Sequence, residues 1–503
     1  MSKESEMRGT KLRGALTPCL SKIPMVERPE RHVPIKTKLA FTILILILYF
    51  ALGNIPLFGL SAESLDLFGR WRAMFAGQRF SLAALGVMPI INASIILQIL
   101  AGPKILKLDL TNPRDQAFYL NAQKLLVLCF VVFASFTYAM GFYMPSLDIA
   151  NQLGVSLRVI SFLLFFQVFI GGMLIYYMEE VVSRWGMGSG VGLFIVAGVS
   201  QQLITGLINW VPDQSGLAVG VIPRWIELVG QRQGIAQEIA GNGIAFLFQH
   251  HLIALITTVA MLFLVLYLAC ARIEIKIPDY SRRAHGRIRF PIKLVHFTWA
   301  IAVPLVFLNL GRILQSGIQG LGRLLYYHGI AIPGTYDEFG SATSGLMFYL
   351  DPIYSPWDWC PPFVYSLYPD VAGWQIAVRI ATDLSIMVAC SMLSAWIWVK
   401  LSPGMETRDL KLMIRDSCLS IHGYRRSIKA IKRAVDKCTL KIAMTGCGIL
   451  GALLVIANMF GTLGFISVTR LILAVCIIYG LYGELRVYNF EDISNPLSLS
   501  RCI

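Results

Sequence analysis

Runs of mostly apolar residues, each about 20 residues long, recur along almost the whole chain, and each could cross a lipid bilayer as a helix. The chain is 56% hydrophobic and only 15% charged, so a water-soluble domain of this composition would expose large apolar patches. We therefore predict an all-α integral membrane protein with about ten transmembrane helices. The runs cover 38–57, 79–101, 119–143, 157–178, 188–210, 248–271, 295–318, 373–399, 441–459 and 462–484.

Basic residues are concentrated in two loops, and this predicts the orientation of the chain. Loop 272–294 holds seven Lys or Arg against two acidic residues, and loop 400–441 holds eleven against four. Lys and Arg are retained on the cytoplasmic face, so both loops are predicted to be cytoplasmic. Loop 319–372, with one Arg against five acidic residues, is predicted to lie outside. An even number of spans then places both termini in the cytoplasm.

The same pattern divides the chain into two halves. Five runs precede the polar stretch 211–247 and five follow it, which forces the halves into opposite topology, as in folds built from inverted repeats with a site between them. We predict a cytoplasmic segment 1–34, an N-terminal half 35–210, an external loop 211–247, a C-terminal half 248–484 and a cytoplasmic tail 485–503. Because residues 1–34 are polar, the first run is expected to stay as a membrane anchor.

Residues 61–77 do not fit an ordinary spanning helix. The segment contains Glu63, Asp66, Arg70 and Arg72, yet it is too rich in large apolar residues for a free loop. One interpretation is a short amphipathic segment that folds back into a polar cavity, since irregular backbone at membrane depth must be buried in protein or line water. The other is a helix lying flat on the outer leaflet, with Trp71 at the headgroups. The residue pattern alone does not choose between them.

Ionisable residues are scarce inside the apolar runs, which argues against an ion-coupled carrier. Arg379 and Asp383, four residues apart on one predicted helix, are expected to neutralise each other. Arg470 is expected to reach an interface along its aliphatic stem. The sequence contains neither a recognisable catalytic motif nor a pattern of Cys and His suited to a metal, and we predict a protein without enzymatic activity or cofactor.

The basic loop 400–441 includes HGYRRSIKAIKRAVDK, in which cations cluster around Tyr424. Such a composition suits the phosphates of RNA or an anionic lipid surface. It is equally the composition of a loop that only determines membrane topology. Two basic loops on one face favour a docking surface. Their composition does not distinguish an RNA partner from an anionic lipid surface.

Several of these segments resemble the SecY family, the central subunit of the protein-conducting channel, and more closely its archaeal and eukaryotic branch. LGVMPIINASIILQILAG at 85–102 is similar to the family's helix 2, and GSGVGLFIVAGVSQ at 188–201 to the start of its helix 5. Residues 22–42, 272–293, 422–435 and 477–485 resemble, in order, the N-terminal segment, the loop between helices 6 and 7, the loop between helices 8 and 9, and the end of helix 10. The resemblance runs from about residue 20 to 485.

The resemblance implies an apolar constriction and a plug. A ring of branched aliphatic side chains would block ions by dewetting and yet spread around a passing polypeptide. Two pairs of ring residues are spaced i, i+4, which places each pair on one helix face. The ring would comprise Val87, Ile91, Val191, Ile195, Val306 and Leu473. Segment 61–77 would be the plug, seated through Leu65, Phe68, Trp71, Met74 and Phe75.

The resemblance also implies partners and an activity. Two small single-span subunits, of SecE and Sec-beta type, would complete a heterotrimer, and the cytoplasmic loops would bind rRNA phosphates and ribosomal proteins. Signal sequences and nascent chains would be the substrates, and transmembrane segments would leave sideways into lipid. The competing hypothesis is an inverted-repeat secondary transporter of a small solute. The expected ribosome contacts are Arg282, Arg283, Arg287, Arg289, Arg425, Arg426 and Lys429.

Overall fold

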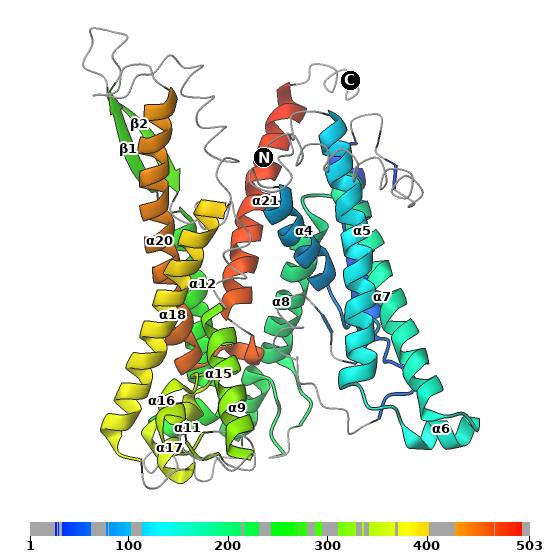
Figure 1. Cartoon of the computed structure of the whole chain (residues 1–503), viewed down its shortest axis with the longest axis vertical. Coiled ribbons are helices and arrows are strands. Elements are labelled where there is room, and N and C mark those ends of the chain that lie inside the picture. The colour runs from blue at the N-terminus through cyan, green and yellow to red at the C-terminus, as the bar shows by residue number, and fades with distance from the viewer. Residues whose placement is uncertain are drawn as a thin grey trace, which may run out of the picture. The chain divides into compact units, whose positions relative to one another are not determined.

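In a computed structural model, the described part of the chain consists of helices, the turns between some of them and one two-stranded hairpin (Figure 1). The chain divides into two compact units, residues 1–200 with 477–503 and residues 201–476. The described residues are 26–27, 29, 33–61, 77–78, 80–101, 113–212, 216–230, 243–270, 272–278, 287–293, 310–327, 334–336, 342–367, 371–401, 428–466 and 468–494.

The first unit is built from long apolar helices and one short surface helix. Helix α5 continues into a single π-helical turn, η1, and packs against both α4 and α7, while α2 packs against α7. Helix α8 begins in this unit and crosses into the second. The elements are α2 (Ile35–Asn54), α4 (Met88–Ala101), α5 (Pro113–Thr137), η1 (Tyr138–Phe142), α6 (Leu147–Leu153), α7 (Leu157–Trp185) and α8 (Gly190–Ile208).

The core of the first unit lies where α5 and α7 meet the turn segment before α4. Val131 of α5 and Leu164 and Val168 of α7 are fully buried. Gly171 permits the close approach, because a Cβ at that position would stand 1.9 Å from the carbonyl oxygen of Leu82. Backbone of one segment therefore rests directly on α7, and any side chain at residue 171 would separate them.

The second unit combines long spans with several short helices. Helix α18 packs along α20, α12 packs on α20, and α15 packs on α18. The elements are α9 (Val221–Gly230), α11 (Ile244–Gln249), α12 (Leu252–Cys270), α15 (Leu310–Tyr327), α16 (Leu346–Leu350), η2 (Pro356–Asp358), α17 (Pro361–Leu367), α18 (Gly373–Leu401), α20 (Ile428–Phe460) and η3 (Leu463–Phe465). Helix α21 (Val468–Ser494) begins here and ends in the first unit.

A β-hairpin within the basic loop 272–294 is the one addition to the predicted all-α fold among the described residues. Strands β1 (Arg272–Pro278) and β2 (Arg287–Lys293) pair antiparallel, with Arg272 opposite Lys293 and Lys276 opposite Arg289. Ile alternates with charged residues in β1, and Ile or Phe occupies every second position of β2. This period of two suits a pleated ribbon. Arg287 and Arg289, two residues apart in β2, therefore share one face of the hairpin.

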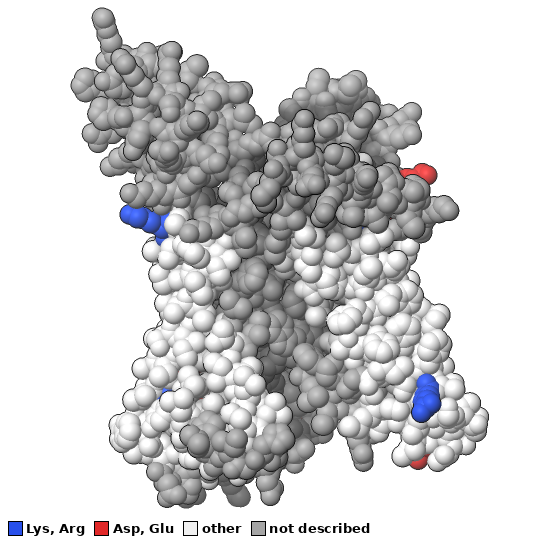
Figure 2. Space-filling view, viewed as in Figure 1, with Lys and Arg blue, Asp and Glu red and all other residues white. Residues whose placement is uncertain are grey.

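Apolar helices of membrane-spanning length confirm a multi-pass membrane protein. Six helices in the described part of the chain are long and apolar enough to span, and the apolar stretches of α4, α12 and α21 are shorter. The described surface in Figure 2 is almost entirely uncharged, as a lipid-facing surface requires. Large apolar side chains such as Phe133 and Phe263 are 68% and 70% exposed. The predicted run 295–318 is described only from Leu310, where α15 begins.

Candidate channel residues and a buried charge network

The predicted ring residues of the first unit lie at the starts of α4 and α8. Val87 immediately precedes α4, and its carbonyl accepts a hydrogen bond from the Ile91 N–H at 3.1 Å, so the two residues are one helical turn apart. Val191 and Ile195 occupy the first two turns of α8. Val87 and Ile195 are buried, whereas Ile91 and Val191 are partly exposed. Val191 also packs against the core formed by α5 and α7.

The remaining ring residues belong to the other unit. Leu473 lies in α21 and is 9% exposed. Val306 lies outside the described residues. The proposed ring residues are divided between the two units of the chain. The ring as a whole stays a prediction.

The ends of segment 61–77 are brought together, although the plug residues themselves lie outside the described part of the chain. The Leu57 N–H donates to the Phe80 carbonyl at 3.0 Å, and the Leu82 N–H donates to Ile55 at 3.1 Å. Pro56 forms a bridge with Ser81, and Leu60 with Pro145. The backbone is thus paired on both sides of the segment, residues 55–57 with 80–82 and residues 60 and 61 with 144 and 145.

The predicted ribosome contacts are described only in part. Arg287 and Arg289 lie in β2, and Lys429 lies in the first turn of α20. Arg282, Arg283, Arg425 and Arg426 lie outside the described residues. In the hairpin, Lys276 stands directly opposite Arg289. The two strands therefore place basic residues at paired backbone positions.

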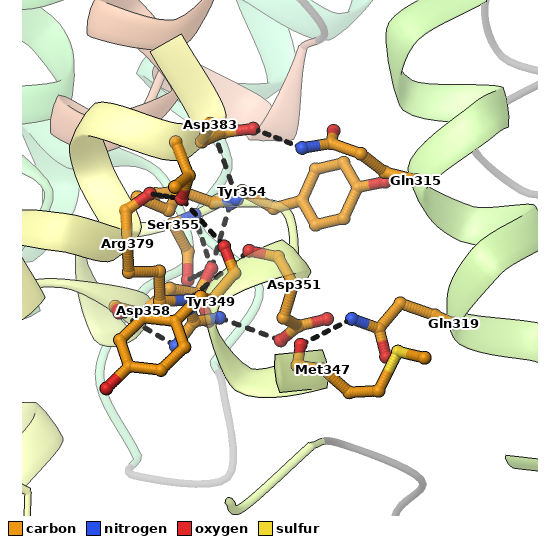
Figure 3. Close-up of polar contacts among 12 residues, drawn as sticks. Gln315, Gln319, Met347, Tyr349, Asp351, Tyr354, Ser355, Asp358, Arg379 and Asp383 are labelled. Carbon is orange, nitrogen blue, oxygen red and sulfur yellow. Dashed lines mark hydrogen bonds and ion pairs between the residues drawn. The ribbon is translucent and has the colours of Figure 1, made fainter. Parts of the chain in front are cut away.

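A network of buried charges in the second unit was not expected from the sequence. Asp383 of α18 is fully buried and accepts two hydrogen bonds from Arg312 of α15, Nη1 to Oδ1 at 2.8 Å and Nη2 to Oδ2 at 3.0 Å. Gln315 Nε2 donates to the same Oδ1 at 2.9 Å. Figure 3 shows Gln315 projecting from α15 toward Asp383. A two-pronged, fully buried pair of this kind is the strong form of a charge-assisted hydrogen bond.

The predicted pairing of Arg379 with Asp383 is wrong. Arg379 instead donates from Nη2 to Asp351 Oδ2 at 2.7 Å and from Nη1 to the Asp358 carbonyl at 3.3 Å, both in the connection after α16 (Figure 3). Residues four apart on a helix can meet, but here each finds a better-placed partner on another element. Burial raises the pKa of Asp351 to about 6, because desolvation outweighs the attraction of Arg379.

Buried charges also occur in the first unit and at Arg470. Glu180 of α7 pairs with Lys124 at 3.1 Å and with Arg184 at 2.7 Å. Arg470 is 4% exposed, so the expectation that it reaches an interface is wrong. Within the described residues no group of His, Cys, Asp or Glu could hold a metal ion. The residue pattern could have indicated the network of α15, because Arg312, Gln315 and Gln319 recur at helical spacing between apolar neighbours.

Comparisons with known proteins agree with the resemblance on which these assignments depend. The SecY family model matches residues 81–482, and the model of the plug domain of Sec61p matches residues 47–79. The protein translocase subunit SecY of Archaeoglobus fulgidus is 44% identical over 477 residues, which cover 94% of this chain and 95% of the relative. That of Halobacterium salinarum is 38% identical and covers 94% of this chain and 95% of the relative.

Two solved structures share the fold over most of the chain. One, described as the structure of a protein conducting channel, has a TM-score of 0.67 and 27% identity, and covers 93% of this chain and 96% of that one. The other, Sec61 in the canine ribosome-channel complex from the endoplasmic reticulum, has a TM-score of 0.63, 27% identity and the same coverage. Both support the predicted all-α channel architecture.

Proposed function

The chain belongs to the SecY family of protein translocase subunits, and on that premise we propose that it forms the channel through which unfolded secretory polypeptides cross the membrane. The family match over residues 81–482 is the observation that carries the proposal. The channel would also release transmembrane segments sideways into lipid, each according to its own transfer free energy. It would not be an enzyme, because the driving force would come from ribosomal elongation or another partner.

The proposed seal has two parts. Val87, Ile91, Val191, Ile195, Val306 and Leu473 would form the apolar ring, and residues 61–77, which lie within the matched plug region 47–79, would close the external funnel. The anchored ends of that segment support the plug, since a covering element must return to the same place each time the channel closes. Apolar residues at the starts of α4 and α8 support the ring.

The proposed partners follow from the charges and from the family. With both termini in the cytoplasm, the hairpin and the start of α20 would face the ribosome, and Arg282, Arg283, Arg287, Arg289, Arg425, Arg426 and Lys429 would contact rRNA phosphates and ribosomal proteins. SecE-type and Sec-beta-type single-span subunits would complete the complex in the cell membrane. The excess of basic residues in loop 272–294, seven Lys or Arg against two acidic residues, supports an anionic partner for the hairpin.

Charge reversal in the hairpin tests the ribosome proposal. Arg287→Glu with Arg289→Glu should weaken ribosome binding by at least tenfold and make it less dependent on salt, because fewer counterions are released. Binding is measured by co-sedimentation at several salt concentrations. Arg323→Glu is the matched control, since this exposed cation of α15 lies in the loop predicted to be external. Unchanged binding would leave the hairpin as a determinant of topology only.

Reconstitution tests the function itself. The full chain, assembled with the two small subunits in proteoliposomes, should move a secretory polypeptide into a protease-protected state when ribosomes synthesise it. Uptake of a small solute without polypeptide transport would instead support the inverted-repeat secondary transporter, which finds no support in the matches reported above. A dead-end complex that neither transports nor protects the polypeptide would contradict the proposal.

A further inference from the structure

Helix α15 buries polar side chains and exposes apolar ones. The side chains that it buries include Arg312, Gln315 and Gln319, which are 6%, 1% and 3% exposed. The side chains that it exposes include Leu314, Leu321 and Leu324, which are 50%, 64% and 58% exposed. An apolar outer face is stable against lipid, but a buried polar face is stable only where hydrogen bonds compensate for the loss of water. The helix therefore depends on what its polar stripe contacts.

Asp383 is the central contact of that stripe. It holds Arg312 through two hydrogen bonds and Gln315 through a third, and its Oδ2 also lies 3.4 Å from the Ile353 N–H in the connection after α16. One turn further along α15, Gln319 Nε2 donates to the Met347 carbonyl of α16 at 2.7 Å (Figure 3). Polar contacts thus join α15 to α18 and to α16 along its buried face.

The same connection is fixed to α18 from the other side. Arg379 holds Asp351 and the Asp358 carbonyl, and Thr382 donates to the Tyr349 carbonyl at 2.7 Å. The guanidinium of Arg312 also lies over the ring of Tyr354, 5.0 Å from its centroid. Helices α15, α16 and α18 are therefore held by three independent sets of polar contacts, none of which is replaced by water without opening the packing.

We propose that Asp383 is a positioning residue that latches α15 to α18, so that α15, α16 and α18 move as one body when the channel admits a polypeptide. The inference rests on the proposed function, and α15 contains the end of the seventh predicted run, 295–318. Pulling α15 away from α18 would leave the charges of Arg312 and Asp383 buried and unpaired, which is far costlier than exposing its leucines to lipid. Opening of the channel therefore moves α15, α16 and α18 together. The helices that move apart are then separated at contacts other than those among these three.

A covalent link between α15 and α18 provides the test. A Cβ added at Gly311 would lie 3.3 Å from the Cβ of the native, free Cys390 of α18, and Met387, whose sulfur is 2.7 Å away, has a flexible side chain that can give way. The Gly311→Cys variant should therefore form a disulfide with Cys390 on mild oxidation. Polypeptide transport into proteoliposomes is compared before oxidation, after oxidation and after reduction.

If Asp383 holds α15 to α18, a disulfide between the two helices should not change polypeptide transport. The oxidised variant should transport a polypeptide within twofold of its reduced form, because the two helices stay together in any case. A loss of tenfold or more on oxidation, restored by reductant, would overturn the latch while leaving the channel function intact. The Gly311→Cys, Cys390→Ser variant, which lacks the second thiol, controls for other effects of the oxidant. Transport that fails in the wild-type protein as well would overturn the proposed function instead.

A measurement on the wild-type protein covers the case in which Gly311→Cys does not fold. Backbone hydrogen exchange is compared between the idle complex and one holding a stalled polypeptide. The latch predicts that amides of residues 312–326 keep their protection in both states, as do those of α18. A tenfold or greater rise in exchange along α15, with α18 unchanged, would show the two helices separating and would overturn the proposal.

Discussion

At the scale of single residues, Asp383 decides the stability of the second unit. Asp383→Asn removes the charge opposite Arg312 and leaves a buried guanidinium without its counter-ion, which should lower the free energy of unfolding by about 3 kcal/mol. Denaturant unfolding of the purified complex measures this, with Ser385→Ala, an exposed position on the same helix, as the matched control. Equal stability of Asp383→Asn and the control would mean that the pair contributes little beyond packing.

Asp351 gives the same unit a pH dependence. Its pKa is raised to about 6, whereas an unfolded Asp titrates near 3.8, so the folded state binds the proton more tightly. Stability from this group is present below pH 3.8 and is lost as the pH rises through 6, by at most about 3 kcal/mol. Burial sets the direction, Arg379 and Arg323 oppose it, and Asp358 and Asp383 add to it.

Unfolding of wild-type protein and of Asp351→Asn at pH 4.5 and 7.5 measures this effect. The wild type should lose more stability between the two values than the variant does. Parallel behaviour of the two proteins would show that Asp351 titrates normally.

At the scale of elements, hydropathy predicted the spans and missed what joins them. The run 441–459 lies within α20, but the helix begins at Ile428, since a helix continues into water after its apolar window ends. Hydropathy predicts a loop where the structure has the hairpin, although RIEIKIP alternates with a period of two. The Arg379 and Asp383 pairing failed because helical spacing predicts neighbours on one helix, whereas Arg312 lies 71 residues away from its partner in the sequence.

The anchored ends of segment 61–77 lead to a prediction for the plug as an element. Replacing residues 62–76 by a short Gly-Ser linker keeps the pairing of 55–57 with 80–82 and of 59–61 with 144–146, so folding should be unchanged. The resting ion conductance in planar bilayers should rise severalfold, because the apolar ring alone must then hold the seal. Thermal unfolding of the same preparation is the control. A collapse in stability would indicate a structural element instead of a plug.

At the scale of the whole molecule, the function requires that a channel be closed to ions and yet open to an unfolded chain. An apolar constriction meets both needs. A narrow ring of apolar side chains loses its water and so blocks ions, and its branched side chains can still move apart around a polypeptide. Apolar positions on a spanning helix can face lipid, core or pore, and the sequence does not distinguish these by composition. Only the family pattern selects Val87, Ile91, Val191 and Ile195, and only conductance can separate a ring from ordinary packing.

Replacing Ile91 and Ile195 together by Ser should raise the resting ion leak in bilayer recordings by at least severalfold, since two hydroxyls would let water enter the constriction. The matched control replaces one isoleucine on each of the same helices, Ile96 of α4 and Ile204 of α8, by Ser. These are 38% and 59% exposed on the surface of the chain. The control carries the same chemical change, so any effect of weakened helices appears in both proteins. A leak of equal size in the two variants, or none in either, would contradict a ring at residues 91 and 195.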